Sequence, residues 1–77
     1  MDDQDILHRV ASLVDEEHRL RGHGAPTDDD RERLAAVEVQ LDQCWDLLRQ
    51  RQARRDAGTD PGQAQVRPPD EVESYLQ

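Results

Sequence analysis

The chain has 77 residues and a single cysteine, so it is one small domain at most and holds no intramolecular disulfide. Only 34% of its residues are hydrophobic and 3% are aromatic, so the core of one copy is thin. Its net charge of −8 argues against general binding to nucleic acid or to anionic membranes.

The first predicted element is a helix over about residues 4–21, followed by a glycine- and proline-rich turn over residues 22–27. The apolar residues of this helix recur at the three- and four-residue intervals of a helical seam. They are Ile6, Val10, Leu13 and Leu20. Because the turn is short, we expect the next helix to lie antiparallel beside the first one.

The second predicted element is a longer helix over about residues 28–57, and the rest of the chain is organised around it. Thr27 is a natural N-cap, and Gly58 suits a left-handed stop. Asp30 stands where a capping box usually has glutamate, so we expect an imperfect box. The apolar seam of this helix consists of Leu34, Val37, Leu41, Cys44 and Leu48. Its last two turns extend beyond the first helix and need a partner or solvent.

Trp45 and Leu47 lie on the two flanks of this seam and widen its apolar face. Burial in the core is the usual fate of tryptophan, and recognition of a partner is the alternative for Trp45. We predict an all-α fold in which residues 1–57 form an antiparallel, coiled-coil-like two-helix hairpin. Because the core is thin, we expect a homodimer with a four-helix arrangement.

Residues 58–77 are predicted to form a proline-containing C-terminal arm without a core of its own. Near its end, Val72, Tyr75 and Leu76 share one face of a short helical turn. Eight residues do not hold a helix alone, so this turn is either frayed or docked. The unpaired end of the second helix, in the same chain or in a dimer mate, is the expected docking site.

All ten basic residues are arginine, and four of them cluster at the end of the second helix. The cluster consists of Arg49, Arg51, Arg54 and Arg55. It suits the negative end of the helix dipole and the acidic segments on either side. A nucleic-acid-associated regulator that uses these arginines on phosphates is the alternative, although the interleaved aromatic residues of a single-strand binder are absent.

A small metal-binding helical protein is the second alternative, since the chain contains His8, His18, His23 and Cys44. None of them forms a C-x-x-C or H-x-x-x-H motif. Asp15 and His18 have the carboxylate-x-x-His spacing of di-iron bundles, but the heptad pattern places both toward solvent. We therefore predict neither a bound metal nor another cofactor.

Enzymatic chemistry has no support in the sequence, because there is no glycine-rich phosphate loop and no nucleophile with a credible base. No apolar run is long enough to span a membrane, and there is no signal peptide pattern, so we expect a cytoplasmic protein. The favoured interpretation is a non-catalytic protein–protein interaction or assembly module that binds itself or another protein, without a small-molecule substrate. Its candidate interaction surface comprises Trp45, Leu47, Arg49, Arg51, Arg54, Arg55, Val72, Tyr75 and Leu76.

Three stretches of the chain resemble one known family of short, mostly actinobacterial proteins. They are VDEEHRLR at residues 14–21, LDQCWDLLRQRQARRDAG at residues 41–58 and VRPPDEVESYLQ at residues 66–77. The family is the one catalogued as domain of unknown function 2630. The resemblance implies a small stand-alone cytoplasmic protein, and it supplies no activity, substrate or catalytic residue.

Overall fold

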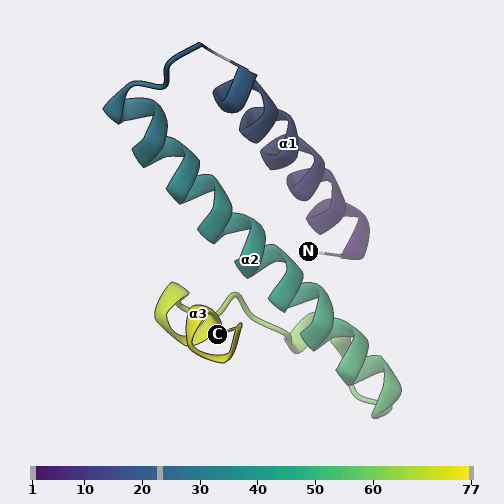
Figure 1. The fold of residues 1–77 in the computed structure, drawn as a ribbon. Coiled ribbons are helices and arrows are strands. Elements are labelled where there is room, and N and C mark those ends of the chain that lie inside the picture. Colours follow the sequence, from purple (N-terminus) through teal and green to yellow (C-terminus); the bar gives the residue numbers. More distant parts are fainter. Residues whose placement is uncertain (1, 23, 77) are drawn as a thin grey trace.

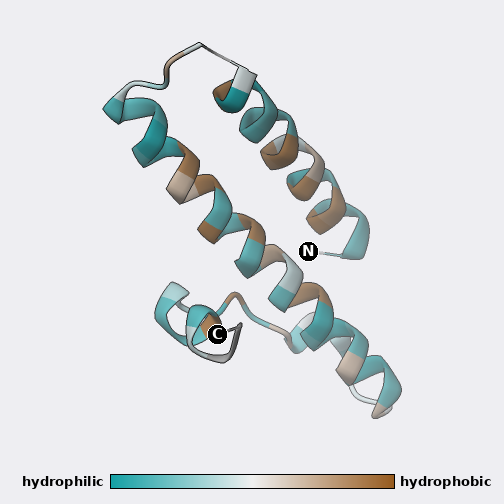
Figure 2. Ribbon diagram, in the orientation of Figure 1, coloured by the Kyte–Doolittle hydropathy of each residue, from teal (hydrophilic) through white to brown (hydrophobic). Residues whose placement is uncertain are grey.

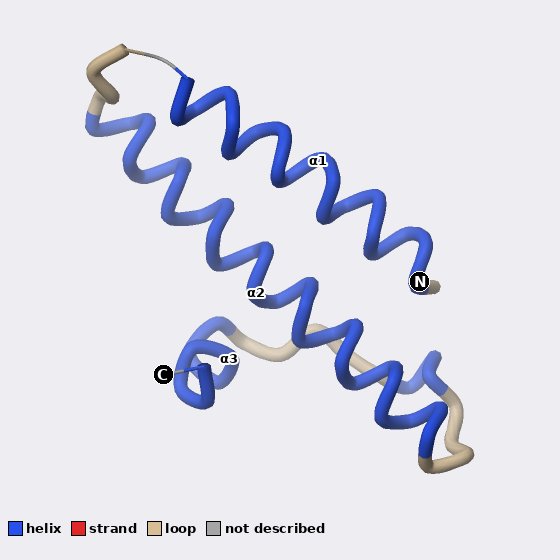
Figure 3. The backbone as a smooth tube through the Cα atoms, turned by 45° about the vertical axis from the view of Figure 1, so that its right-hand side comes forward, coloured by secondary structure: helices blue, strands red, loops and turns tan. Residues whose placement is uncertain are grey.

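The computed structural model describes the backbone of residues 2–22 and 24–76 and the side chains of residues 2–22 and 24–74. Its elements are α1 (Asp3–Gly22), α2 (Asp28–Asp56), the 3₁₀ turn η1 (Pro61–Gln63) and α3 (Pro69–Leu76). No residue of the described ranges lies in a strand, so the predicted all-α class is confirmed. Figures 1 and 3 show α1 antiparallel beside α2, while the arm returns along the opposite side of α2 and places α3 near its middle.

The helix α1 begins with a pair of aspartates that satisfy each other's backbone. The N–H of Asp5 donates to Asp2 Oδ1 over 2.9 Å, and the N–H of Asp2 donates to Asp5 Oδ2 over 3.2 Å. The bond from the Asp5 backbone lowers the pKa of the Asp2 carboxyl, because it stabilises the charged form. First-turn N–H groups that α1 itself leaves unpaired are satisfied in this way.

The helix α2 is capped at both ends. Thr27 Oγ1 accepts from the Asp30 N–H over 3.1 Å, and Asp30 Oδ2 accepts from the Thr27 N–H over 3.0 Å. The capping box is therefore complete, and the expected imperfection is wrong, because the shorter aspartate side chain still reaches the cap backbone. At the other end Gly58 has a φ of 75°, and its N–H donates to the Arg55 carbonyl over 3.1 Å.

Replacing Thr27 with alanine is expected to lower the free energy of unfolding by about 1 kcal/mol, because the Asp30 N–H loses its acceptor. Urea denaturation followed by circular dichroism measures this change. The matched control Thr27→Ser keeps the hydroxyl and should stay close to the wild type. An equal loss in both variants would show that the hydroxyl is not responsible.

The core between α1 and α2 is narrow, as the hydropathy pattern in Figure 2 shows. Six hydrophobic side chains of the described residues are buried: Ile6, Val10, Leu13, Val37, Leu47 and Val72. Polar side chains cross between the helices in three pairs, Arg9–Gln40, Glu16–Arg33 and Arg21–Glu38. The first two pairs share one antiparallel register, in which residues 9 and 16 of α1 face residues 40 and 33 of α2. Exposed pairs of this kind contribute only about 0–1 kcal/mol each, so they fix the register more than the stability.

The arm docks on its own chain through side chains of α2 that satisfy its backbone carbonyls. Gln50 Nε2 donates to the Gln65 carbonyl over 2.7 Å, and Gln43 Nε2 donates to the Arg67 carbonyl over 3.1 Å. Neither carbonyl lies within a helix or strand, so these side-chain donors replace the backbone hydrogen bonds that regular secondary structure would supply. At the end of the arm Val72 is fully buried. The start of the arm, at η1, lies beside the end of α2 that α1 leaves without a partner. The helix α3 instead docks near the middle of α2, so the expectation that the terminal turn docks on that free end is wrong.

Candidate interaction surface

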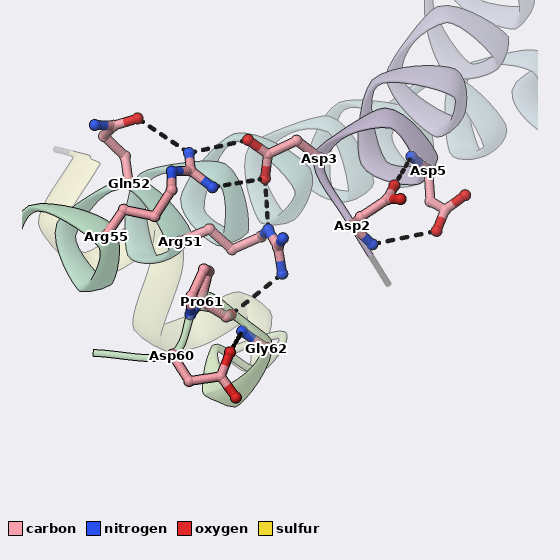
Figure 4. Close-up of polar contacts among 9 residues, drawn as sticks. All are labelled: Asp2, Asp3, Asp5, Arg51, Gln52, Arg55, Asp60, Pro61 and Gly62. Carbon is pink, nitrogen blue, oxygen red and sulfur yellow. Dashed lines mark hydrogen bonds and ion pairs between the residues drawn. The ribbon is translucent and has the colours of Figure 1, made fainter. Parts of the chain in front are cut away.

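Two of the four clustered arginines hold the fold together. Arg51 Nε donates to Asp3 Oδ1, and its Nη1 donates to the Pro61 carbonyl over 3.2 Å. Arg55 Nη2 lies 2.9 Å from Asp3 Oδ2, so both guanidinium groups converge on one carboxylate (Figure 4). These bonds lower the pKa of Asp3, because they favour its charged form. Arg51 is only 9% exposed, and it joins α1, α2 and η1.

The other two predicted arginines point in different directions. Arg49 is exposed, whereas Arg54 is half-buried and lines a hollow under the arm together with Gln50 and Arg67. The four arginines therefore do not form one continuous basic surface. The main partners of these arginines are therefore the negative end of the α2 dipole and carboxylates of the same chain.

Trp45 and Leu47 have opposite environments. Leu47 is 6% exposed and lies at the floor of a groove of about 510 Å³ that α1, α2 and Val66 of the arm enclose. Trp45 is 46% exposed, so the expectation that it is a core residue is wrong. The arm covers one flank of the α2 seam, where Leu47 lies, and the described residues leave the flank with Trp45 partly open.

The three residues predicted at the end of the arm share the helix α3. Val72 is fully buried, so it stabilises the docked arm and is not available to another protein. The side chains of Tyr75 and Leu76 lie outside the described residues. Of the predicted surface, Trp45, Arg49 and Arg55 are exposed among the described side chains, and Arg55 is paired with Asp3.

Asp46 is a key residue that the sequence did not reveal. Although charged, it is 1% exposed and accepts two bonds from Arg67, over 2.9 Å from Nε and 2.7 Å from Nη2. Gln50 Nε2 donates a third bond to it over 3.0 Å. The carboxylate raises the pKa of the Arg67 guanidinium by hydrogen bonding. This pair of a buried aspartate and a partly exposed arginine fastens the arm to α2.

Trp45 belongs to an apolar stripe along α2. The stripe continues through Leu34, Leu41 and Leu48, which recur every seven residues and are half-buried. At 3.6 residues per turn, these leucines lie within about 60° of Trp45 around the helix axis. A stripe of this width is typical of a helix that packs against a neighbour.

The helix α1 extends this apolar surface. Leu7, Val14 and Arg21 are spaced by seven residues, so they lie along one side of α1. Arg21 Nη2 donates over 2.7 Å to Glu38, which precedes Trp45 by seven residues on α2. Leu7 and Val14 therefore flank the same side of the hairpin as Trp45, and Leu7 is 47% exposed. We call this surface the open face; it consists of Leu7, Val14, Leu34, Leu41, Trp45 and Leu48.

The described residues offer little support for a metal site or for a reactive nucleophile. No three histidine, cysteine, aspartate or glutamate side chains of the described part meet as a group that would hold a metal ion. Cys44 is half-buried in the groove, and burial raises the pKa of its thiol, which disfavours the reactive thiolate. His8 and His18 are exposed, and His23 lies outside the described residues. In the part of the chain that the structure covers, no helix has the length and hydropathy needed to cross a membrane.

The fold and the open face define a small all-α protein, a helical hairpin whose arm folds back along α2. The chain belongs to the family described as "Protein of unknown function (DUF2630)", whose model matches residues 2–77. This confirms the resemblance of the three sequence stretches. The chain is 47% identical to uncharacterized proteins of Mycobacterium bovis and Mycobacterium tuberculosis, over 95% of its own length and 88% of theirs. No solved structure matches it.

Proposed function

We propose that this chain is a non-catalytic protein–protein interaction module that recognises its partner through the open face. The observation that carries the proposal is Trp45, 46% exposed at the edge of an apolar stripe on a small chain. Contiguous apolar surface that is left exposed on a small protein is a mark of interaction sites. Tryptophan is also one of the residues that contribute most to binding at interfaces.

The remaining structure supports this function by giving the open face a rigid base. The arm is fixed by the bonds of Arg67 to the buried Asp46, and the start of α1 is fixed by Asp3 with Arg51. Both ion pairs lie away from the apolar stripe. They therefore hold the helices in place and leave the stripe accessible to a partner. Side chains held by a packed scaffold lose less entropy on binding than mobile ones.

The proposal predicts that a photoreactive side chain at position 45 crosslinks to a protein in living cells. We would place p-benzoylphenylalanine there in a mycobacterial host, where relatives of this chain occur. The matched control carries the same group at Arg19, an exposed position of α1 without the seven-residue spacing of Leu7 and Val14. An adduct at position 45 and none at position 19 is the expected result, and an absence of adducts at both overturns the proposal.

With the crosslinked partner in hand, replacing Trp45 with alanine is expected to weaken binding by at least about 30-fold, or about 2 kcal/mol. Isothermal titration calorimetry measures the loss. Circular dichroism should show unchanged helicity, because Trp45 is 46% exposed and contributes little to the core.

A further inference from the structure

We propose that the partner is a second copy of the chain, which packs its α2 antiparallel against this α2 across a twofold axis that passes through the open face at the level of position 43. This inference rests on the proposed function and adds the identity of the partner and the register. In a twofold antiparallel pair, an axis at position 43 brings Leu41 opposite Trp45 of the second copy, and the reverse. Both tryptophans then pack on leucine in the centre of the interface.

The charged residues around the open face fit this register. Arg31, Glu38, Arg49 and Asp56 lie within about 40° of Trp45 around α2, at 3.6 residues per turn. All four are exposed in the single chain. In the antiparallel register Glu38 comes within one residue of Arg49 of the second copy, and Arg31 within one residue of Asp56. The twofold axis repeats both pairs, so four attractive contacts flank the apolar centre.

The alternative parallel pairing is disfavoured by the same residues. In register, it would place Glu38 beside Glu38 and Arg49 beside Arg49, and like charges that face each other directly are repulsive. It would also set Trp45 against Trp45 in place of the complementary leucine. The charge pattern therefore selects the antiparallel orientation.

The neighbours of α2 leave this side available. Figures 1 and 3 show α1 and α3 on opposite sides of α2. Within the described residues these two helices do not contact each other, so they do not close over α2. Leu7 and Trp45, which are each about half exposed, mark the open side of α2 between α1 and α3. Each α1 would then add Leu7 to the interface, giving four helices around a shared core.

The test is sedimentation equilibrium of the full chain over a wide concentration range, with charge-reversal variants. Wild type is expected to form a dimer of twice 8.9 kDa. Glu38→Arg and Arg49→Glu alone should each weaken it about tenfold, because the twofold axis turns two attractive pairs repulsive. The double variant restores opposite charges in exchanged positions and should recover the wild-type constant within about threefold.

Several outcomes separate this inference from the proposed function. The chain could stay monomeric while the crosslinker at position 45 captures a different protein. That result would overturn the proposal that the partner is a second copy, and it would support the interaction module. A monomer without any adduct overturns both. A dimer that ignores the charge reversals uses another face and also overturns the inference. Because Glu38 also accepts a bond from Arg21, thermal melts of each variant establish that the hairpin remains folded.

Discussion

Replacing Arg67 with methionine is expected to release the arm from α2 while the hairpin stays helical. The guanidinium group makes the paired bonds that neutralise Asp46, whose carboxylate is 1% exposed. Removing one member of a fully buried ion pair leaves an uncompensated charge, which costs about 3–5 kcal/mol in measured cases. The cost here is smaller, because the Arg67 side chain is 37% exposed and only Asp46 is fully buried. The chain avoids most of this cost by lifting the arm, because water then reaches Asp46.

Hydrogen exchange measured by mass spectrometry follows this release. The amides of α3, including Val72, whose N–H donates to the Pro68 carbonyl, should exchange about a hundredfold faster in the variant. Amides in the middle of α2 should keep their protection. Such a local loss differs from global unfolding, which would speed exchange throughout the chain.

The matched control for this variant is Arg54→Met, which makes the same chemical change under the arm. Arg54 lines the same hollow as Arg67, but its guanidinium makes no hydrogen bond to Asp46. The control should therefore leave the exchange of α3 close to wild type. Equal exchange in Arg67→Met and wild type would show that the buried pair does not hold the arm.

The helices were predictable because their signals are local. The predicted ranges of about 4–21 and 28–57 compare with Asp3–Gly22 and Asp28–Asp56 in the structure. Apolar residues spaced by three and four define the facing sides, and Thr27 and Gly58 define the ends of α2. Each of these signals involves residues within one or two turns of each other.

The location of the arm was not predictable in this way. Trp45 and Leu47 lie symmetrically about the seam, and the sequence does not reveal which flank the arm covers. That choice depends on Arg67 reaching Asp46 from 21 residues away along the chain. A helical pattern places an aspartate such as Asp46 in solvent, because an unpaired buried charge is rare. Its burial becomes understandable only with its partner in place.

The same reason explains the changed interpretation of the arginine cluster. Sequence composition alone groups Arg51 with Arg49 as one charged surface. In the structure Arg51 bonds Asp3 and the Pro61 carbonyl, at separations of 48 and 10 residues. The candidate surface therefore moves from the arginines to the apolar residues around Trp45.

Acidification toward pH 4.5 is expected to tighten the docking of α3 on α2. Glu73 of α3 faces Asp42 of α2, and Glu73 Oε1 is buried without a hydrogen-bond partner. The Asp42 carboxyl, by hydrogen bonding, together with burial, raises the pKa of Glu73 above its ordinary value of 4.5. The docked arm therefore binds a proton more tightly than the released arm.

The sign of the effect follows from this raised pKa. The contribution of Glu73 to docking is fully present below about pH 4.5 and is lost as the pH rises through its higher folded value. Two other acidic side chains of α2 and α3 are paired with Arg67: Asp46 binds it, and Glu71 lies 3.6 Å from it. The charge of Asp42 therefore opposes that of Glu73 at neutral pH.

Ion pairs of the hairpin respond in the opposite direction. The pKa values of Asp3 and Glu16 are lowered by their arginine partners, so their stabilisation is present above the ordinary values of 3.8 and 4.5. It is lost as the pH falls through their lower folded values. Mildly acidic solution near pH 5 should thus combine a tightly docked α3 with an intact hairpin.

Protection factors of the α3 amides between pH 4.5 and pH 7.5 test this dependence. They should decrease with rising pH in the wild type, and Glu73→Gln should hold them near their acid value throughout, because glutamine carries no charge toward Asp42. The exposed neighbour Asp70 provides the control variant Asp70→Asn, which should keep the wild-type trend. Protection that rises with pH, or a Glu73→Gln profile that follows the wild type, would show that the two carboxyls do not govern docking.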